Sequence, residues 1–361
     1  MPMTPPTPVS IPVVDVRHGG PLRHAIQGRL RARALRDDCI VWFPRIMRLV
    51  VPLLDALTRR WLKRTSSPYL AEIESIAETL GFSGVWFLNC SYGWCCTALA
   101  RDAGGAPWLA RTLDWPFPGL GRRAEVARME GPAGDYWSVT WPGYVGVLTA
   151  MAPRRFAVAL NQAPLWRRTR HPWLRLCDIA INAMTAWMHA RQIPPDQLLR
   201  QVCETCRTFA QAKERLETVP VARPAIYILV GCAAGERCVI ERTEEEGATR
   251  FDDTVAANDW LHPKSPWEAR IGGELGLVAT AAEAAENSRL RRDALAGWRG
   301  RLTHDSFGWV TPPVLNPFTR IAVEMCPATV TLRVVGYEIV SGGKLPQPAT
   351  QRCEVAIALA T

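Results

Sequence analysis

The residues with the clearest chemical potential lie at positions 96–117, in the stretch CTALARDAGGAPWLARTLDWPF. Two apolar segments flank a Gly-Gly turn, a pattern that predicts a β-hairpin. If the hairpin is centred between Ala103 and Gly104, Cys96 pairs with Arg111, and Asp114 lies just beyond that pair. A thiol, a guanidinium and a carboxylate then meet at one end of two strands, which is a usable arrangement for nucleophilic chemistry.

Two non-catalytic interpretations of this hairpin stay open. A free cysteine is most often a small buried hydrophobe, and Arg111 and Asp114 are equally suited to a surface ion pair that closes the hairpin. In favour of chemistry, a guanidinium beside a thiol stabilises the thiolate. None of the six His residues of the chain lies in this stretch, so any base that serves Cys96 is of another kind.

The elements that must position these residues follow from hydrophobic periodicity and turn chemistry. Residues 1–14 are expected to form a loosely attached arm and residues 20–82 a series of helices, followed by a strand at 85–89. Further along, we expect hairpins at 145–160 and 226–241, helices at 173–191, 194–216 and 281–298, and a last pair of strands at 319–335. Paired strands between paired helices predict an α+β fold in which two antiparallel sheets lie between helix layers.

The net charge of +9 is concentrated in one segment. Residues 17–64 hold twelve Arg or Lys against three acidic residues, whereas the rest of the chain is balanced at 31 of each sign. Apolar residues are interleaved with the basic ones, so residues 28–64 suit either an anionic membrane surface or a solvated face packed on the core. No nucleic-acid-binding motif accompanies the charge, and we predict no nucleic-acid partner.

The start of the chain shows no secretory signal, and no apolar run is long enough to span a bilayer. These features predict a cytoplasmic or peripheral membrane protein.

Three stretches outside the hairpin add residues that bear chemistry. Asn161 ends the segment 142–161, Asn258 lies in Val-Ala-Ala-Asn-Asp-Trp, and Arg291 ends Asn-Ser-x-x-Arg. Together with Cys-Thr at 96–97 and Arg-x-x-Asp-Trp-Pro-Phe at 111–117, they make residues 83–340 resemble the N-terminal-nucleophile (Ntn) amidases. The closest likeness is to the branch of acid ceramidase, N-acylethanolamine acid amidase, bile-salt (choloylglycine) hydrolase and the penicillin acyl-coenzyme A acyltransferases.

This resemblance implies a four-layer αββα sandwich and a mechanism that begins with cleavage before Cys96. The α-amine freed by cleavage has an unperturbed pKa of about 7.7–8.0, so it accepts the thiol proton near neutrality. By resemblance, Cys96 is the nucleophile, Arg111 orients it, Asp114 holds the α-amine and Asn258 donates to the oxyanion. Residues 1–95 then form a helical pro-segment and residues 96–361 the amidase domain, so the mature protein is a heterodimer of its own fragments.

The remaining site residues predicted by resemblance are Asn161, Arg291 and Trp115, which we expect to contact substrate. No metal or other cofactor is implied. The predicted function is hydrolysis of a linear, non-peptide C–N bond in a small-molecule, lipid-like acyl amide. Acyl transfer to an amine, cleavage of another acyl amide, and a non-catalytic lipid-binding role on the same fold remain the alternatives.

Overall fold

The computed structural model describes residues 7–41, 45–90, 95–166, 171, 174–262, 267–268, 281–340 and 342–355. Its larger sheet has eight strands in the order β1-β4-β5-β6-β7-β9-β10-β11, antiparallel except for the parallel pair β1–β4. These strands are β1 (Val13–Asp15), β4 (Glu125–Met129), β5 (Tyr136–Thr140), β6 (Thr149–Ala152), β7 (Phe156–Gln162), β9 (Ala225–Val230), β10 (Arg237–Arg242) and β11 (Gly247–Arg250).

The second sheet runs in the order β12-β2-β3-β14-β15-β16, and β17 also pairs with β15. Its strands are β12 (Val255–Ala256), β2 (Cys95–Ala103), β3 (Ala106–Asp114), β14 (Thr319–Cys326), β15 (Thr331–Glu338), β16 (Gln347–Pro348) and β17 (Cys353–Glu354). A separate two-stranded pair joins β8 (Leu165–Trp166) to β13 (Trp267–Glu268).

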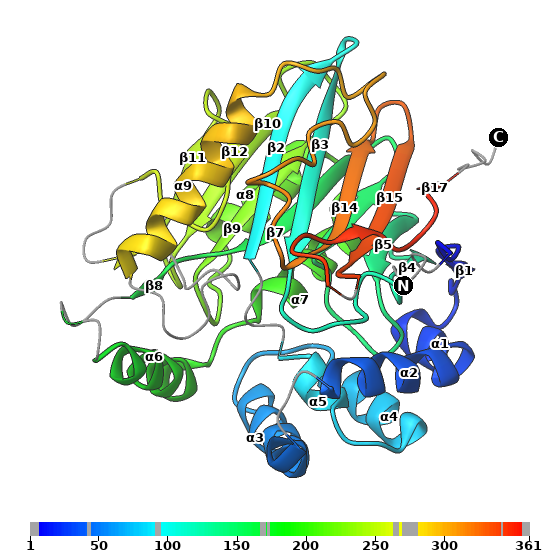
Figure 1. Cartoon of the computed structure of the whole chain (residues 1–361), viewed down its shortest axis with the longest axis vertical. Coiled ribbons are helices and arrows are strands. Elements are labelled where there is room, and N and C mark those ends of the chain that lie inside the picture. The colour runs from blue at the N-terminus through cyan, green and yellow to red at the C-terminus, as the bar shows by residue number, and fades with distance from the viewer. Residues whose placement is uncertain are drawn as a thin grey trace.

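The helices fall into an N-terminal group and a second group from the later part of the chain (Figure 1). The N-terminal group contains α1 (Gly20–Gln27), α2 (Arg29–Ile40), the 3-10 helix η1 (Arg45–Val50), α3 (Val51–Leu62), α4 (Leu70–Leu80) and α5 (Val85–Leu88). The second group contains α6 (Arg175–His189), α7 (Pro195–Thr205), α8 (Phe209–Thr218) and α9 (Ala281–Gly297).

The two sheets face each other, and a helix layer covers each outer face. Ala98 of β2, Ala159 of β7 and Leu198 of α7 belong to one core cluster, whereas Leu99 of β2 packs with Leu295 of α9 in a second. Successive side chains of a strand point to opposite faces, so β2 lies between the larger sheet and α9. The layers follow as α9, the smaller sheet, the larger sheet, and α7 with α8. The predicted αββα arrangement is confirmed.

The register of the hairpin differs from the prediction. Gly104 and Gly105 have φ values of +62° and +82° and form a two-residue turn between Ala103 and Ala106, as glycine permits in tight hairpins. The centre therefore lies one residue later than predicted, and Cys96 pairs with Leu113 rather than Arg111. Because the shift moves the partner by two residues, the faces on which the side chains lie are unchanged.

The apolar segment at 85–89 was predicted as a strand and instead forms the short helix α5. The Asp55 carboxylate accepts hydrogen bonds from the backbone N–H groups of Gly84 (2.6 Å) and Phe87 (2.8 Å), which satisfies donors at the start of the helix. A run of four apolar residues has no period that separates strand from helix, so this side-chain cap decides the outcome.

The single helix predicted at 194–216 is two helices, α7 and α8. Cys206 is extended, and the Thr208 hydroxyl accepts a hydrogen bond from the Gln211 N–H at 3.2 Å, which starts a new helix. The prediction of a loosely attached arm at 1–14 is wrong for residues 13 and 14, which pair with Val126 and Ala127 of β4, and for Val9, which bridges to Thr350. Residues 1–6 of the predicted arm lie outside the described residues. Among the described residues, no helix is both long enough and apolar enough to cross a membrane.

Asn89 fastens the N-terminal helices to the sheet region just before β2. Its side-chain amide donates to the Val85 and Gly143 carbonyls (2.9 and 2.8 Å), and its carbonyl accepts from the Val145 N–H (2.8 Å). The side chain is buried, so both backbone groups of the 143–145 turn depend on it for their hydrogen bonds.

We therefore expect Asn89→Ala to lower the free energy of unfolding by about 2–3 kcal/mol, because it leaves buried polar groups without partners. Gln27→Ala, which removes an exposed amide from α1, should change it by less than about 0.5 kcal/mol. Urea unfolding of both variants measures the difference, and equal values for the two variants would contradict this account of Asn89.

Candidate active site

Cys96 lies fully buried on the face of β2 that points toward the larger sheet. Arg111 of β3 shares that face, and its Nη2 donates to the Cys96 Sγ at 2.8 Å. Two of the three groups predicted to meet are therefore in contact, diagonally across the hairpin rather than directly opposite each other.

The Arg111 guanidinium is held in place by the larger sheet. Its Nη2 also donates to the Leu160 carbonyl (2.8 Å), and its Nη1 donates to the Leu148 carbonyl (2.6 Å) and to the Thr149 hydroxyl. All these acceptors are neutral, so no carboxylate in these contacts neutralises the cation that faces the thiol. Arg111 is thus fixed in position and available to a thiolate.

The electrostatics of Cys96 reflect two opposing influences. Burial raises the pKa of the Cys96 thiol, and the nearby positive charge of Arg111 opposes that rise. Burial prevails, so the thiol is neutral in the uncleaved chain and needs a base to activate it.

Asp114 lies on the opposite face of the hairpin from Cys96, toward α9. Its Oδ2 accepts a hydrogen bond from the Asn316 amide at 2.8 Å and lies 3.8 Å from Nη1 of Arg291. Burial raises the pKa of the Asp114 carboxyl, and Arg291 and the hydrogen bond from Asn316 oppose the rise. The third predicted group therefore acts on the backbone side of Cys96 rather than on its thiol.

Arg291 extends from α9 and contacts residues of both β2 and the loop after β12. Its Nη1 donates to the Cys96 carbonyl (2.9 Å) and to the Thr97 hydroxyl (2.8 Å), and its Nη2 donates to Asn258 Oδ1 (3.0 Å). The sequence predicted Arg291 only as a substrate contact. The structure instead places it against the backbone of Cys96.

Asn258 follows β12 and holds the backbone nitrogen of Cys96. The Cys96 N–H donates to Asn258 Oδ1 at 3.0 Å, and Asn258 Nδ2 donates to the Gln162 carbonyl at 2.9 Å. The resemblance assigned the Cys96 nitrogen to Asp114, but in this uncleaved chain the contact belongs to Asn258. The amide of Asn258 keeps one further N–H with which it can donate.

The two other predicted substrate contacts lie on different sides of the site. Asn161 on β7 is fully buried, and its Nδ2 donates to the Ala256 and Ala257 carbonyls (3.2 and 3.1 Å), which supports the chain just before Asn258. Trp115 immediately follows Asp114 and lines a cavity described below. These two residues do not share one surface in the structure.

Asn316 is the functional neighbour that sequence reasoning missed. Its contact with Asp114 spans 202 positions, and the only local signal is the Asn-Pro pair at 316–317, which marks a turn. No group of three or more His, Cys, Asp or Glu able to hold a metal ion occurs within the described ranges.

No protein-family model matches this chain. Among curated proteins, it is similar to the N-acylethanolamine-hydrolyzing acid amidase of Cavia porcellus, with 26% identity over 239 residues, 64% of this chain and 60% of that protein. It is also similar to the acid ceramidase of Pan troglodytes, with 27% identity over 122 residues, 34% of this chain and 28% of that protein. The resemblance predicted from the motifs is confirmed.

This chain spans less than two thirds of the length of the acid amidase from Cavia porcellus. Among solved structures, the Caenorhabditis elegans N-acylethanolamine-hydrolyzing acid amidase ortholog overlaps it with a TM-score of 0.47 at 20% identity, covering 65% of this chain and 93% of that chain. An overlap this low supports no functional argument, so the proposal below rests on the site itself and on the sequence relatives.

The raised pKa of Asp114 predicts how stability depends on pH. In wild type the unfolded carboxyl ionises at lower pH than the native one, so this group makes the fold less stable as pH rises through that interval. Asp114→Asn removes the ionisation and keeps an oxygen for Asn316. Its melting temperature should therefore exceed that of wild type at about pH 8, and the gap should close toward about pH 2, well below the unfolded pKa of about 3.9, where both wild-type states are protonated.

Thermal unfolding across this pH range measures the effect. The opposite result would be a variant that is less stable than wild type at high pH, with a smaller difference at low pH. That result would mean that the attraction between Arg291 and the ionised carboxylate outweighs the cost of burying the charge.

Proposed function

We propose that this protein is a hydrolase of a lipid-like acyl amide and that it matures by cleaving its own chain before Cys96. The observation that carries the proposal is the set of contacts around one residue. Arg111 contacts the Cys96 thiol, Asn258 the Cys96 nitrogen and Arg291 the Cys96 carbonyl. The sequence relatives named for amide hydrolysis support the same conclusion.

Maturation uses the thiol on its own peptide bond. The Cys96 sulfur attacks the Cys95 carbonyl carbon, the C–N bond breaks as the nitrogen takes up the thiol proton, and a thioester forms. Water then hydrolyses the thioester, leaving a carboxylate on Cys95 and a free thiol and amine on Cys96. The hydrogen bond from the Cys96 nitrogen to Asn258 holds that nitrogen in place during the change.

Catalysis then uses the new amine as the base. The amine takes the thiol proton, the sulfur attacks the amide carbonyl, and the protonated amine gives its proton to the leaving nitrogen. Water resolves the acyl-enzyme by the reverse route. Arg111 stabilises the thiolate, Asp114 holds Arg291 in place, and the Nδ2 of Asn258 donates to the oxyanion.

Contacts across the cleavage point support a heterodimer of the two fragments, residues 1–95 and 96–361. β1 of the first fragment pairs with β4 of the second. The buried side chain of His24 contacts Glu125 at 2.8 Å, Tyr69 donates to Glu204 at 2.6 Å, and Asn89 holds the 143–145 turn. Cutting one peptide bond breaks none of these contacts.

An apolar cavity supports a substrate with a hydrocarbon chain. It lies between the N-terminal helices and the segment that follows Asp114, so both proposed fragments contribute to it. Leu35 and Cys39 of α2, Phe87 of α5, and Trp115 and Phe117 are among its lining residues. Trp115 follows Asp114, the last residue of β3, so the cavity reaches the end of the strand that carries Arg111 and Asp114.

We expect Cys96→Ala to remain a single chain and to lack hydrolase activity, because it removes the thiol that is the nucleophile in both maturation and catalysis. Intact mass spectrometry detects cleavage, and fluorogenic N-acyl aminocoumarins with acetyl and palmitoyl groups report hydrolysis, with the long chain preferred by wild type. Cys95→Ala is the matched control, since it removes the neighbouring buried thiol and should still be cut before Cys96.

The two fragments of wild type should elute together in gel filtration. Product analysis with an added amine separates hydrolysis from acyl transfer. A wild-type protein that stays full length at acidic and neutral pH, and hydrolyses neither probe, would refute the proposal and leave a non-catalytic lipid-binding role.

We further propose that α3 and α6 contact an anionic membrane surface, as a peripheral protein would. Leu49, Leu53 and Leu57 recur every fourth residue along η1 and α3 and are 80%, 57% and 42% exposed. Trp61, one turn further on, donates to the Ala186 carbonyl of α6 at 3.0 Å.

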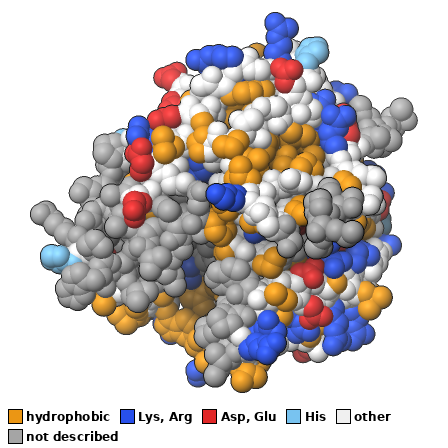
Figure 2. Space-filling view, in the orientation of Figure 1, with side chains coloured by type: hydrophobic (Ala, Val, Ile, Leu, Met, Phe, Trp, Pro, Cys, Tyr) orange, Lys and Arg blue, Asp and Glu red, His pale blue; other side chains and the backbone are white. Residues whose placement is uncertain are grey.

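Met184 and Met188 of α6 extend this apolar face, and both residues are about half exposed. Hydrophobic side chains gather at the lower edge of Figure 2, over α6 and α3. Arg45, Arg60 and Lys63 are exposed in the same segment. Apolar residues flanked by cations suit insertion at an anionic interface.

We expect the double variant Leu49→Ser, Leu53→Ser to bind anionic vesicles about tenfold or more weakly, since it removes two large side chains from the apolar face. Leu30→Ser on α2 is the matched control, because Leu30 is 84% exposed outside this face. Co-sedimentation of the full chain with phosphatidylserine-containing vesicles measures binding. No binding by wild type, or equal loss in the control, would exclude this surface.

A further inference from the structure

The segment after β12 needs an anchor beyond its strand. β12 pairs with β2 only through Val255 and Ala256, so the ladder ends two residues before Asn258. Asn258 must nevertheless keep its Oδ1 within 3.0 Å of the Cys96 nitrogen. Something other than sheet pairing fixes its backbone.

That anchor is a hydroxyl from α9. The Asn258 N–H donates to the Ser288 Oγ at 2.8 Å, and the Ser288 hydroxyl donates to Asp259 Oδ1 at 2.9 Å. A hydroxyl has one proton to donate. Because that proton is donated in the hydrogen bond to Asp259, a lone pair of the Ser288 oxygen is directed at the Asn258 N–H.

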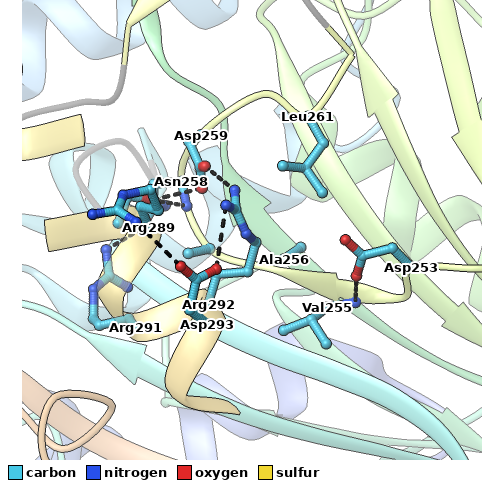
Figure 3. A network of polar contacts seen from close by, with 12 residues as sticks. Asp253, Val255, Ala256, Asn258, Asp259, Leu261, Arg289, Arg291, Arg292 and Asp293 are labelled. Carbon is cyan, nitrogen blue, oxygen red and sulfur yellow. Dashed lines mark hydrogen bonds and ion pairs between the residues drawn. The ribbon is translucent and has the colours of Figure 1, made fainter. Parts of the chain in front are cut away.

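Arg292 in turn holds Asp259. It lies one helical turn after Ser288 and forms an ion pair with Asp259 Oδ2. The two side chains are 13% and 16% exposed, so water screens this pair less than an exposed surface pair. Figure 3 shows Asp259 and Arg292 meeting between the loop after β12 and helix α9, with Arg291 beside them.

We propose that Asp259 and Arg292 are positioning residues for Asn258. Together they orient the Ser288 hydroxyl, and Ser288 fixes the backbone from which the Asn258 amide reaches Cys96. The kinetic part of this proposal rests on the proposed hydrolase function, in which Asn258 stabilises the transition state. Neither residue contacts Cys96 or Arg111 in the described contacts.

Loss of the pair should loosen Asn258 without removing it. A displaced oxyanion donor weakens an interaction made in the transition state, so kcat should fall about tenfold while KM changes by less than about twofold. Asp259→Ala and Arg292→Ala should have similar effects, and the double variant should be little worse than either, because both break the same pair. Arg292→Lys should recover much of the loss.

Arg289→Ala is the matched control. Arg289 lies on the same helix and pairs with Glu286 (2.5 Å) and Asp293 (3.5 Å), so the variant also removes one positive charge and its ion pairs from α9. Its side chain is 52% exposed, and its ion pairs are with residues of the same helix. Activity should remain within about twofold of wild type.

Hydrogen exchange of the full chain, followed by mass spectrometry, gives a readout that does not need turnover. The amide of Asn258 should exchange about tenfold faster in Asp259→Ala and Arg292→Ala than in wild type or Arg289→Ala, since its acceptor is no longer oriented. If wild type hydrolyses no amide probe, the proposed function fails while the exchange result still decides the positioning role.

Unchanged exchange at Asn258 in both variants would overturn the positioning role. If wild type is active, an unchanged kcat in Asp259→Ala and Arg292→Ala would also overturn it. An equal loss of kcat in Arg292→Ala and Arg289→Ala would do the same.

Discussion

The position of the Cys96 backbone depends on one buried guanidinium, that of Arg291. Arg291 donates to the Cys96 carbonyl, to the Thr97 hydroxyl and to Asn258, and it lies near the Asp114 carboxylate. A buried cation needs such partners to offset its loss of hydration. The same need that stabilises Arg291 therefore brings β2, β3, the loop after β12 and helix α9 together at one point, and that point is the backbone of Cys96.

Different layers of the fold hold the side chain and the backbone of Cys96. Alternation along β2 directs the Cys96 side chain toward the larger sheet and the Thr97 side chain toward α9. Backbone carbonyls and a hydroxyl of the larger sheet fix Arg111, which contacts the thiol. Helix α9 fixes the backbone through Arg291. The larger sheet thus positions the side chain and α9 the backbone, so changes in these two layers affect Cys96 through different contacts.

Local pattern predicted the elements better than it predicted their partners. The hairpin, the helix at 281–297 and the layer order follow from periodicity and turn residues, and the contact of Cys96 with Arg111 survived an error in register because the error was two residues. Two partners of Arg291, Cys96 and Thr97, lie 195 and 194 positions away, beyond any local signal. Helix α5 escaped prediction for a related reason, since Asp55, the residue that caps it, lies 29 positions upstream.

The proposed cleavage would change the chemistry of Cys96 while leaving its surroundings in place. In the uncleaved chain, the nitrogen is an amide that donates to Asn258 and has no basic lone pair. After cleavage, the same nitrogen becomes an amine in the same buried position. Burial and the nearby Arg291 cation both disfavour its protonated form, whereas Asp114 on the far side of Arg291 favours it. The balance of these charges would keep the amine unprotonated and able to accept the Cys96 proton. Without such a base the buried thiol stays protonated, because burial raises its pKa.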